Sequence, residues 1–153
     1  EETFVSASPE KHGSARVVRA EVTEAPISVT ELADAVHDAA AGAVVTFEGV
    51  VRNHDADRGV TGIGYSCHPT AGQIVEQIAG DIAERGRVRA LGVVHRVGDL
   101  AVGEAALAVA VSSDHRAEAF ATCSQIVEEV KKRLPVWKRQ TFTDGTSQWS
   151  NLA

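Results

Sequence analysis

One proline, Pro135, divides the last part of the chain into two kinds of secondary structure. The residues before it, from Val127 onward, have the pattern of a helix end, and a proline ends a helix because its nitrogen has no hydrogen to donate. The residues after it are typical of a short strand, followed by a turn at Asp144 and Gly145. A helix end followed at once by a strand gathers four cations at one corner of the fold, where they can receive an anion: Lys131, Lys132, Arg133 and Lys138.

Hydrophobic periodicity predicts the elements that precede this corner. Apolar and β-branched runs predict strands at residues 15–23, 43–52, 61–67, 88–97 and 104–113, with polar loops at 53–59 and 98–103. Ser28 and Glu31 form a capping-box pattern that begins a helix ending at Gly42, Pro69 suits the start of a second helix, and Asp114 is a good N-cap for a third. The buried face of that third helix is predicted to consist of Phe120, Cys123, Val127, Val130 and Leu134. This order predicts an α+β fold in which three main helices cover a mixed, largely antiparallel sheet.

Size and charge narrow the class of protein. A chain of 153 residues suits one domain, which we assign to residues 15–153, and the polar, patternless residues 1–14 are expected to form a loose N-terminal arm. A net charge of -6 argues against nucleic-acid binding, which needs a positive surface. Cys67 and Cys123 lack the spacing of a metal site or a disulfide framework, so we expect no metal and a reducing compartment, the cytoplasm. No apolar run approaches the ~18–20 residues of a membrane span.

A second candidate anion site lies at the start of the third helix. His115 and Arg116 fall in its first turn, where free backbone N–H groups and the positive end of the helix dipole attract phosphate or carboxylate. Arg52, at the end of an apolar strand, has the same potential. For His115, Arg116 and Arg52, the alternative is a solvated surface without a ligand. For the cations at the end of the same helix, the alternative is favourable interaction with the helix dipole, which does not account for Lys138. His95 lies within a strand and is assigned to packing and hydrogen bonding in the fold.

Four motifs together resemble one protein family. They are GAVVTFEGVVRNH at residues 42–54, HRVGDLAVGE at 95–104, SSDHRAEAF at 112–120 and VKKRLPVWKRQ at 130–140, with DGTSQW following. In this order, over about residues 17–149, they resemble the large, catalytic subunit of molybdopterin synthase. The resemblance implies an α/β hammerhead-type fold and a homodimer that takes up one small ubiquitin-like subunit at each end, giving a heterotetramer. The small subunit's C-terminal Gly-Gly thiocarboxylate would donate sulfur to cyclic pyranopterin monophosphate, and two transfers would make the dithiolene of molybdopterin.

The resemblance also implies roles for individual residues. The catalytic residues would be two lysines, Lys131 and Lys138. The phosphate and pterin of the substrate would be bound by Arg52, His115 and Arg116, with the His-Arg pair supplied by the partner protomer. The pocket would also be lined by Phe47. No metal or other cofactor is implied.

Two places depart from the family pattern, and one alternative function stays open. Gln140 stands where many members have a glutamate, so a role of that glutamate is not carried over, and YSCHP at residues 65–69 replaces the usual tyrosine-glutamate-alanine-tyrosine run. The alternative is a non-catalytic dimeric module that binds a ubiquitin-like tail or a small phosphorylated ligand. Such a module would need positive charge, but not lysine at both Lys131 and Lys138, and this favours the enzyme.

Overall fold

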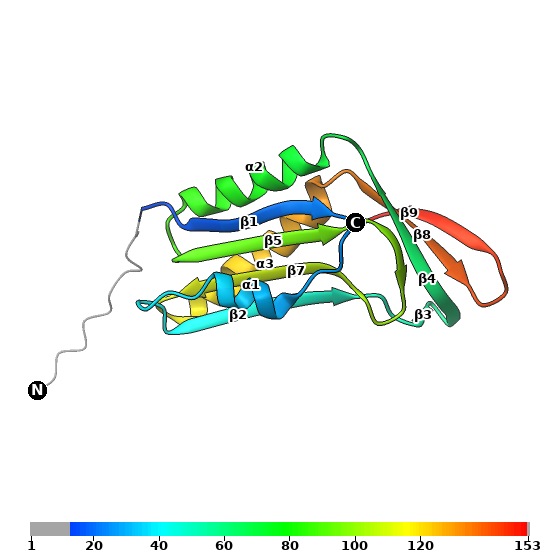
Figure 1. Ribbon diagram of the computed structural model, residues 1–153, viewed down its shortest axis with the longest axis horizontal. Helices are drawn as coiled ribbons and strands as arrows, with labels where there is room; N and C mark the ends of the chain where they lie inside the picture. The colour runs from blue at the N-terminus through cyan, green and yellow to red at the C-terminus, as the bar shows by residue number, and fades with distance from the viewer. Residues whose placement is uncertain (1–12, 153) are drawn as a thin grey trace, which may run out of the picture.

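The computed structural model describes residues 13–152, and its main sheet has four strands (Figure 1). The strands are β1 (Arg16–Thr23), β5 (Ala90–Arg96), β7 (Ala105–Ser113) and β2 (Ala43–Val50), in that spatial order. β1 pairs with β5 in parallel, whereas the β5–β7 and β7–β2 pairs are antiparallel. The predicted α+β class with a mixed, largely antiparallel sheet is therefore confirmed. Most of the predicted arm, residues 1–12, lies outside the described residues.

Three helices cover the two faces of this sheet, which explains why β5 reads as a continuous apolar run. α2 (Ala71–Glu84) and α3 (Arg116–Arg133) pack on one face, against a cluster that includes Leu91 and Val109. α1 (Val29–Ala35) lies on the other face, where Leu32 packs against small side chains of β5 and β7. Figure 1 shows α1 in front of the sheet and α3 behind it. The predicted Ser28 cap is present, since its hydroxyl accepts from the Glu31 N–H at 3.2 Å.

α1 is shorter than predicted, and it packs very closely on the sheet. A Cβ on Gly92 of β5 would stand 2.6 Å from Leu32 Cδ1, so the helix sits directly on a glycine. The helix ends at Ala35, and the chain then turns back before β2 begins. Gly42, predicted to stop the helix, instead allows a close approach, because a Cβ there would lie 2.8 Å from the Asp114 carbonyl oxygen.

A second sheet is built around one long strand, β4 (Arg58–Cys67), and projects from one end of the main sheet (Figure 1). β4 pairs with β3 (His54–Asp55), β6 (Gly98–Ala101) and β8 (Val136–Phe142), and β8 pairs with β9 (Ser147–Asn151). The two predicted loops are thus partly wrong, since each contains a short strand. The β3–β4 turn places Ala56 and Asp57 at positive φ, a conformation characteristic of tight hairpins.

Two predictions for α3 are wrong. Asp114 does not cap the helix: His115 holds the cap position without a side-chain hydrogen bond, while the Asp114 carboxylate accepts two bonds from Arg89, at 2.6 and 2.9 Å. The helix therefore begins one residue later than predicted. Phe120 is not buried but 61% exposed, because the buried stripe passes through Ala119 and Cys123 instead.

Candidate functional site

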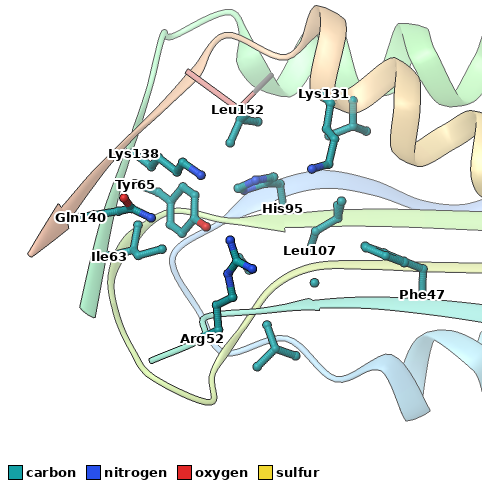
Figure 2. A pocket seen from close by; sticks show the side chains of 14 residues that line it. Phe47, Arg52, Ile63, Tyr65, His95, Leu107, Lys131, Lys138, Gln140 and Leu152 are labelled. Atoms are coloured by element: carbon teal, nitrogen blue, oxygen red, sulfur yellow. The ribbon is translucent and has the colours of Figure 1, made fainter. Parts of the chain in front are cut away.

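A cavity of about 270 Å³ lies where the C-terminal end of α3 and the main sheet meet the second sheet (Figure 2). Its wall is shared among β2, β4, β5, β7, β8 and α3, so segments far apart in the sequence meet there. The residues that line it are Phe47, Gly49, Val50, Arg52, Ile63, Tyr65, His95, Ala106, Leu107, Val130, Lys131, Lys138, Gln140 and Leu152. Four of the six predicted site residues are therefore brought together: Phe47, Arg52, Lys131 and Lys138.

Arg52 reaches the cavity from just beyond the end of β2. The register of the β2–β7 pair shifts between Gly49 and Val50, an irregularity of the β-bulge kind just before this arginine. Arg52 donates to Asp55 Oδ1 at 3.4 Å, a long contact, and its side chain is 68% exposed. An exposed ion pair of this length contributes little, so the guanidinium is available to another anion.

Lys131 and Lys138 are joined by a short link whose ends are fixed. The Leu134 N–H donates to the Val130 carbonyl at 3.0 Å, which closes the last turn of α3, and the His68 N–H donates to the Pro135 carbonyl at 3.0 Å. Leu134 is buried, and so is Val136, where β8 begins. Along β8 the side chains then alternate, so Lys138 and Gln140 turn to the cavity while Arg139 faces away, over the Trp149 ring. We call residues 132–137 the α3–β8 link.

The charge around the cavity has one sign. Among the described residues that line it, Arg52, Lys131 and Lys138 are cations and no lining residue is an acid. Within residues 13–152 neither lysine forms an ion pair, whereas Arg133 next to them pairs with Asp81 at 3.3 Å and Glu129 at 3.6 Å. Uncompensated cations in a partly enclosed cavity favour an anionic ligand, because the surrounding protein screens their charge less than water does.

Three other lining residues, His95, Tyr65 and Gln140, are polar but uncharged, and the sequence did not place them at the site. His95 is only 3% exposed, and burial lowers the pKa of its imidazole to about 4, so the ring is uncharged at neutral pH. The Tyr65 ring meets it edge-on, with centroids 5.3 Å apart at 74°, and burial raises the pKa of the Tyr65 hydroxyl. Gln140, two residues beyond Lys138 on β8, is also buried. His95, assigned to packing from the sequence, thus also faces the cavity.

His115 and Arg116 do not line this cavity. They stand at the opposite end of α3, and 16 residues at 1.5 Å each place His115 about 24 Å from Lys131 along one helix. Both side chains are exposed. One protomer therefore cannot bring both ends of α3 to a single small ligand.

The described residues offer neither a metal site nor a membrane-spanning helix. Within residues 13–152, no group of three or more His, Cys, Asp or Glu side chains is arranged to hold a metal ion. No helix in the described part of the chain has the length and apolar character needed to cross a membrane.

Comparison with known proteins identifies the family. The family model described as MoaE protein matches residues 22–133. A molybdopterin synthase catalytic subunit of Nostoc sp. is 36% identical over 133 residues, which cover 86% of this chain and 81% of that protein. The crystal structure of molybdopterin synthase from Staphylococcus aureus superposes with a TM-score of 0.79 at 29% identity, over 86% of this chain and 96% of that one.

One more solved structure shares the fold. It is a protein–protein complex of subunits 1 and 2 of the molybdopterin-converting factor from Helicobacter pylori, with a TM-score of 0.64 at 19% identity, and the match covers 89% of each chain. The family model covers more than half of this chain, and the relatives align over most of their length. The chain belongs to the MoaE family, the family of molybdopterin synthase catalytic subunits.

Proposed function

We propose that this chain is the large, catalytic subunit of a molybdopterin synthase, and that sulfur transfer takes place in the cavity described above. The observation that carries the assignment of the site is a cavity lined by three cations and, among the described residues, by no acid. The proposed sulfur donor, a C-terminal thiocarboxylate, and the proposed acceptor, cyclic pyranopterin monophosphate, are both anions. Each needs positive charge in a place that excludes bulk water.

Some of the residues that line the cavity suit substrate binding, and others suit catalysis. Arg52 suits the phosphate, because a guanidinium donates two parallel hydrogen bonds to phosphate oxygens. Lys131 and Lys138 flank the cavity from α3 and β8 (Figure 2). There a lysine ammonium stabilises the negative charge that develops as the thiocarboxylate sulfur attacks, and it can also pass a proton to a reacting oxygen. Two transfers, each from one thiocarboxylated small subunit, supply the two sulfurs of the dithiolene.

Neighbouring lysines provide a matched test of this assignment. Lys131 lines the cavity and Lys132 does not, although both are exposed in the last turn of α3. We expect Lys131→Ala to lower dithiolene formation by ~100-fold or more, the usual effect of removing one transition-state stabiliser, and Lys132→Ala to stay within about twofold of wild type. Because both residues are exposed, each variant should keep its unfolding free energy within about 0.5 kcal/mol.

The assay supplies cyclic pyranopterin monophosphate and thiocarboxylated small subunit, and measures the dithiolene product. Near-normal turnover of Lys131→Ala would remove this lysine from catalysis. Equal losses of dithiolene formation in Lys131→Ala and Lys132→Ala would show that only the overall charge of the helix end matters.

A shared site explains why His115 and Arg116 lie so far from the cavity. The start of β2 adjoins the start of α3, since Ala43 pairs with Ser113. The end of β2 adjoins the cavity, through Val50. At about 3.3 Å per residue β2 spans roughly 23 Å, close to the distance along α3. An antiparallel copy of β2 would therefore set the start of one α3 beside the cavity of the other protomer.

We place a second copy of this chain on the outer edge of β2, which ends the main sheet and has no strand partner among the described residues. α3 packs over both β7 and β2, so a two-fold pairing of β2 strands would set the two α3 axes about two strand spacings, ~10 Å, apart. That separation is the usual distance between packed helices. It would also cover Phe120, the exposed aromatic residue of α3.

The remaining partner and the compartment follow from the same assignment. We propose that a small ubiquitin-like subunit inserts its Gly-Gly tail into the cavity, since a tail without side chains can pass through a narrow entry. We assign the activity to the cytoplasm. Cys67 and Cys123 are free thiols, as expected where thiols are kept reduced.

A further inference from the structure

The hydrogen bond of His95 determines which of its ring nitrogens faces a ligand. His95 Nδ1 lies 2.8 Å from the Arg96 carbonyl oxygen. A carbonyl oxygen can only accept, so Nδ1 carries the proton, and in the neutral ring Nε2 then has a free lone pair. Burial keeps the ring neutral, as the lowered pKa of His95 indicates. His95 therefore presents a fixed hydrogen-bond acceptor rather than a cation.

Nε2 is open to the cavity. His95 lines the cavity, and the only hydrogen bond of its side chain within residues 13–152 is the one from Nδ1. In the same part of the chain, Ser112 Oγ is the only fully buried side-chain nitrogen or oxygen without a hydrogen-bond partner. Nε2 of His95 also lacks a partner there, so it must be accessible to solvent. A buried side chain held in one orientation, with an acceptor facing a cavity, is prepared for a ligand that donates an N–H or O–H.

The surroundings of His95 fit a planar ring. Tyr65 packs edge-on against the imidazole at 5.3 Å between centroids, and Ile63, Leu107 and Phe47 supply apolar surface around the same cavity. The cations come from three elements, with Arg52 beyond β2, Lys131 on α3 and Lys138 on β8, where it pairs with Tyr65 of β4. The cavity thus offers cations for anionic groups and, beside them, neutral and partly aromatic side chains for a heterocycle (Figure 2).

We propose that His95 Nε2 accepts a hydrogen bond from an N–H of the substrate's pterin ring and so sets the orientation of the ring in the cavity. This inference rests on the proposed function, because it takes cyclic pyranopterin monophosphate as the ligand. Arg52 and the lysines attract the anionic groups, but point charges alone leave the heterocycle free to turn. A neutral acceptor held in one orientation fixes which edge of the ring faces β5, on which His95 lies.

Two substitutions separate this role from the structural role of the imidazole. In His95→Asn the amide occupies the place of Nδ1, so it can still donate to the Arg96 carbonyl, but it presents nothing at the place of Nε2. In His95→Gln the longer side chain carries a carbonyl oxygen to the place of Nε2 and gives up the bond to Arg96. A purely structural histidine would be replaced better by asparagine, and a substrate-positioning histidine better by glutamine.

Steady-state kinetics with each substrate varied in turn give the first readout. We expect His95→Asn to raise the KM for cyclic pyranopterin monophosphate by ~10-fold or more, because a buried ligand N–H loses its acceptor, and to leave the KM for the thiocarboxylated small subunit unchanged. His95→Gln should recover most of this loss. An unchanged substrate KM in His95→Asn would overturn the proposal, and so would a rise confined to the KM for the small subunit, which would assign Nε2 to the tail.

The second readout uses the unmodified chain and does not depend on turnover or on folding of a variant. In protein labelled with ¹⁵N-histidine, cyclic pyranopterin monophosphate should shift the Nε2 resonance of His95 while Nδ1 stays protonated. If the substrate binds and Nε2 does not shift, the proposal is wrong. Failure of the proposed function has a different signature, because the wild-type protein would then neither bind cyclic pyranopterin monophosphate nor form the dithiolene.

Discussion

The buried imidazole of His95 should make the protein lose stability at mildly acidic pH. Burial lowers the pKa of this group from its ordinary value of 6.5 to about 4, against a weaker opposing effect of its bond to the Arg96 carbonyl. At a pH between these two values, His95 is protonated in the unfolded chain but stays neutral in the folded chain. Stability is therefore fully present above pH 6.5 and falls as the pH drops toward 4.

The size of the loss follows from the two pKa values. For a group that titrates at 6.5 when unfolded and at about 4 when folded, lowering the pH from 7.5 to 5 costs about 2 kcal/mol of unfolding free energy.

Urea unfolding at pH 7.5 and pH 5.0, at one protomer concentration, measures the effect. The control is His95→Asn, which can keep the bond to the Arg96 carbonyl but cannot titrate. Carboxylates and the other histidines contribute equally to both proteins, so the wild type should lose about 2 kcal/mol more than the variant between the two pH values. Equal losses in the two proteins would show that the imidazole is not held neutral by the fold.

Three further predictions concern the proposed catalytic assembly. Lys138→Arg keeps the charge but not the ready proton transfer, so turnover should fall by ~100-fold with substrate binding retained, and a well-functioning variant would make Lys138 an electrostatic contact only. Arg116→Ala and Lys131→Ala homodimers should each be nearly inactive, while the purified mixed dimer should regain about half of wild-type activity, since one of its two sites is intact. No recovery would mean that each protomer builds its own site. Deleting the two C-terminal glycines of the small subunit should abolish turnover and weaken binding only in part, as titration of the two subunits can measure, and unchanged turnover would contradict tail insertion.

The sequence predicted those parts of the fold that follow a regular hydrophobic period. The strands of the main sheet and the three helices were recognisable, and Pro135 correctly separated α3 from β8. β6 and β9 were not predicted, because β6, at four residues, is too short to give a clear period, and β9 is exposed along its whole length and has no alternation. Such strands exist because β4 and β8 offer them backbone partners, which is information that a local pattern lacks.

In the candidate site, too, the sequence could place some residues and not others. Lys131 and Lys138 could be placed at one corner because only a short link separates them along the chain. His95 could not be placed, since β5 is buried on both faces and its sequence has no alternation that would distinguish the cavity side. The exposed position of Phe120 was missed because a helical period predicts a stripe but not its boundary, and one step around α3 separates Phe120 from Ala119.

The α3–β8 link limits which insertions and deletions the chain can tolerate. Adding or removing one residue within it would either unseat Leu134 or Val136 from the core or shift β8 by one position against β4. Because a strand alternates its faces, that shift would turn Lys138 away from the cavity and bring a neighbour into its place. Composition and net charge would hardly change, yet the two lysines would no longer face one ligand. We therefore expect the number of residues between Lys131 and Lys138 to be as strictly constrained as their identities.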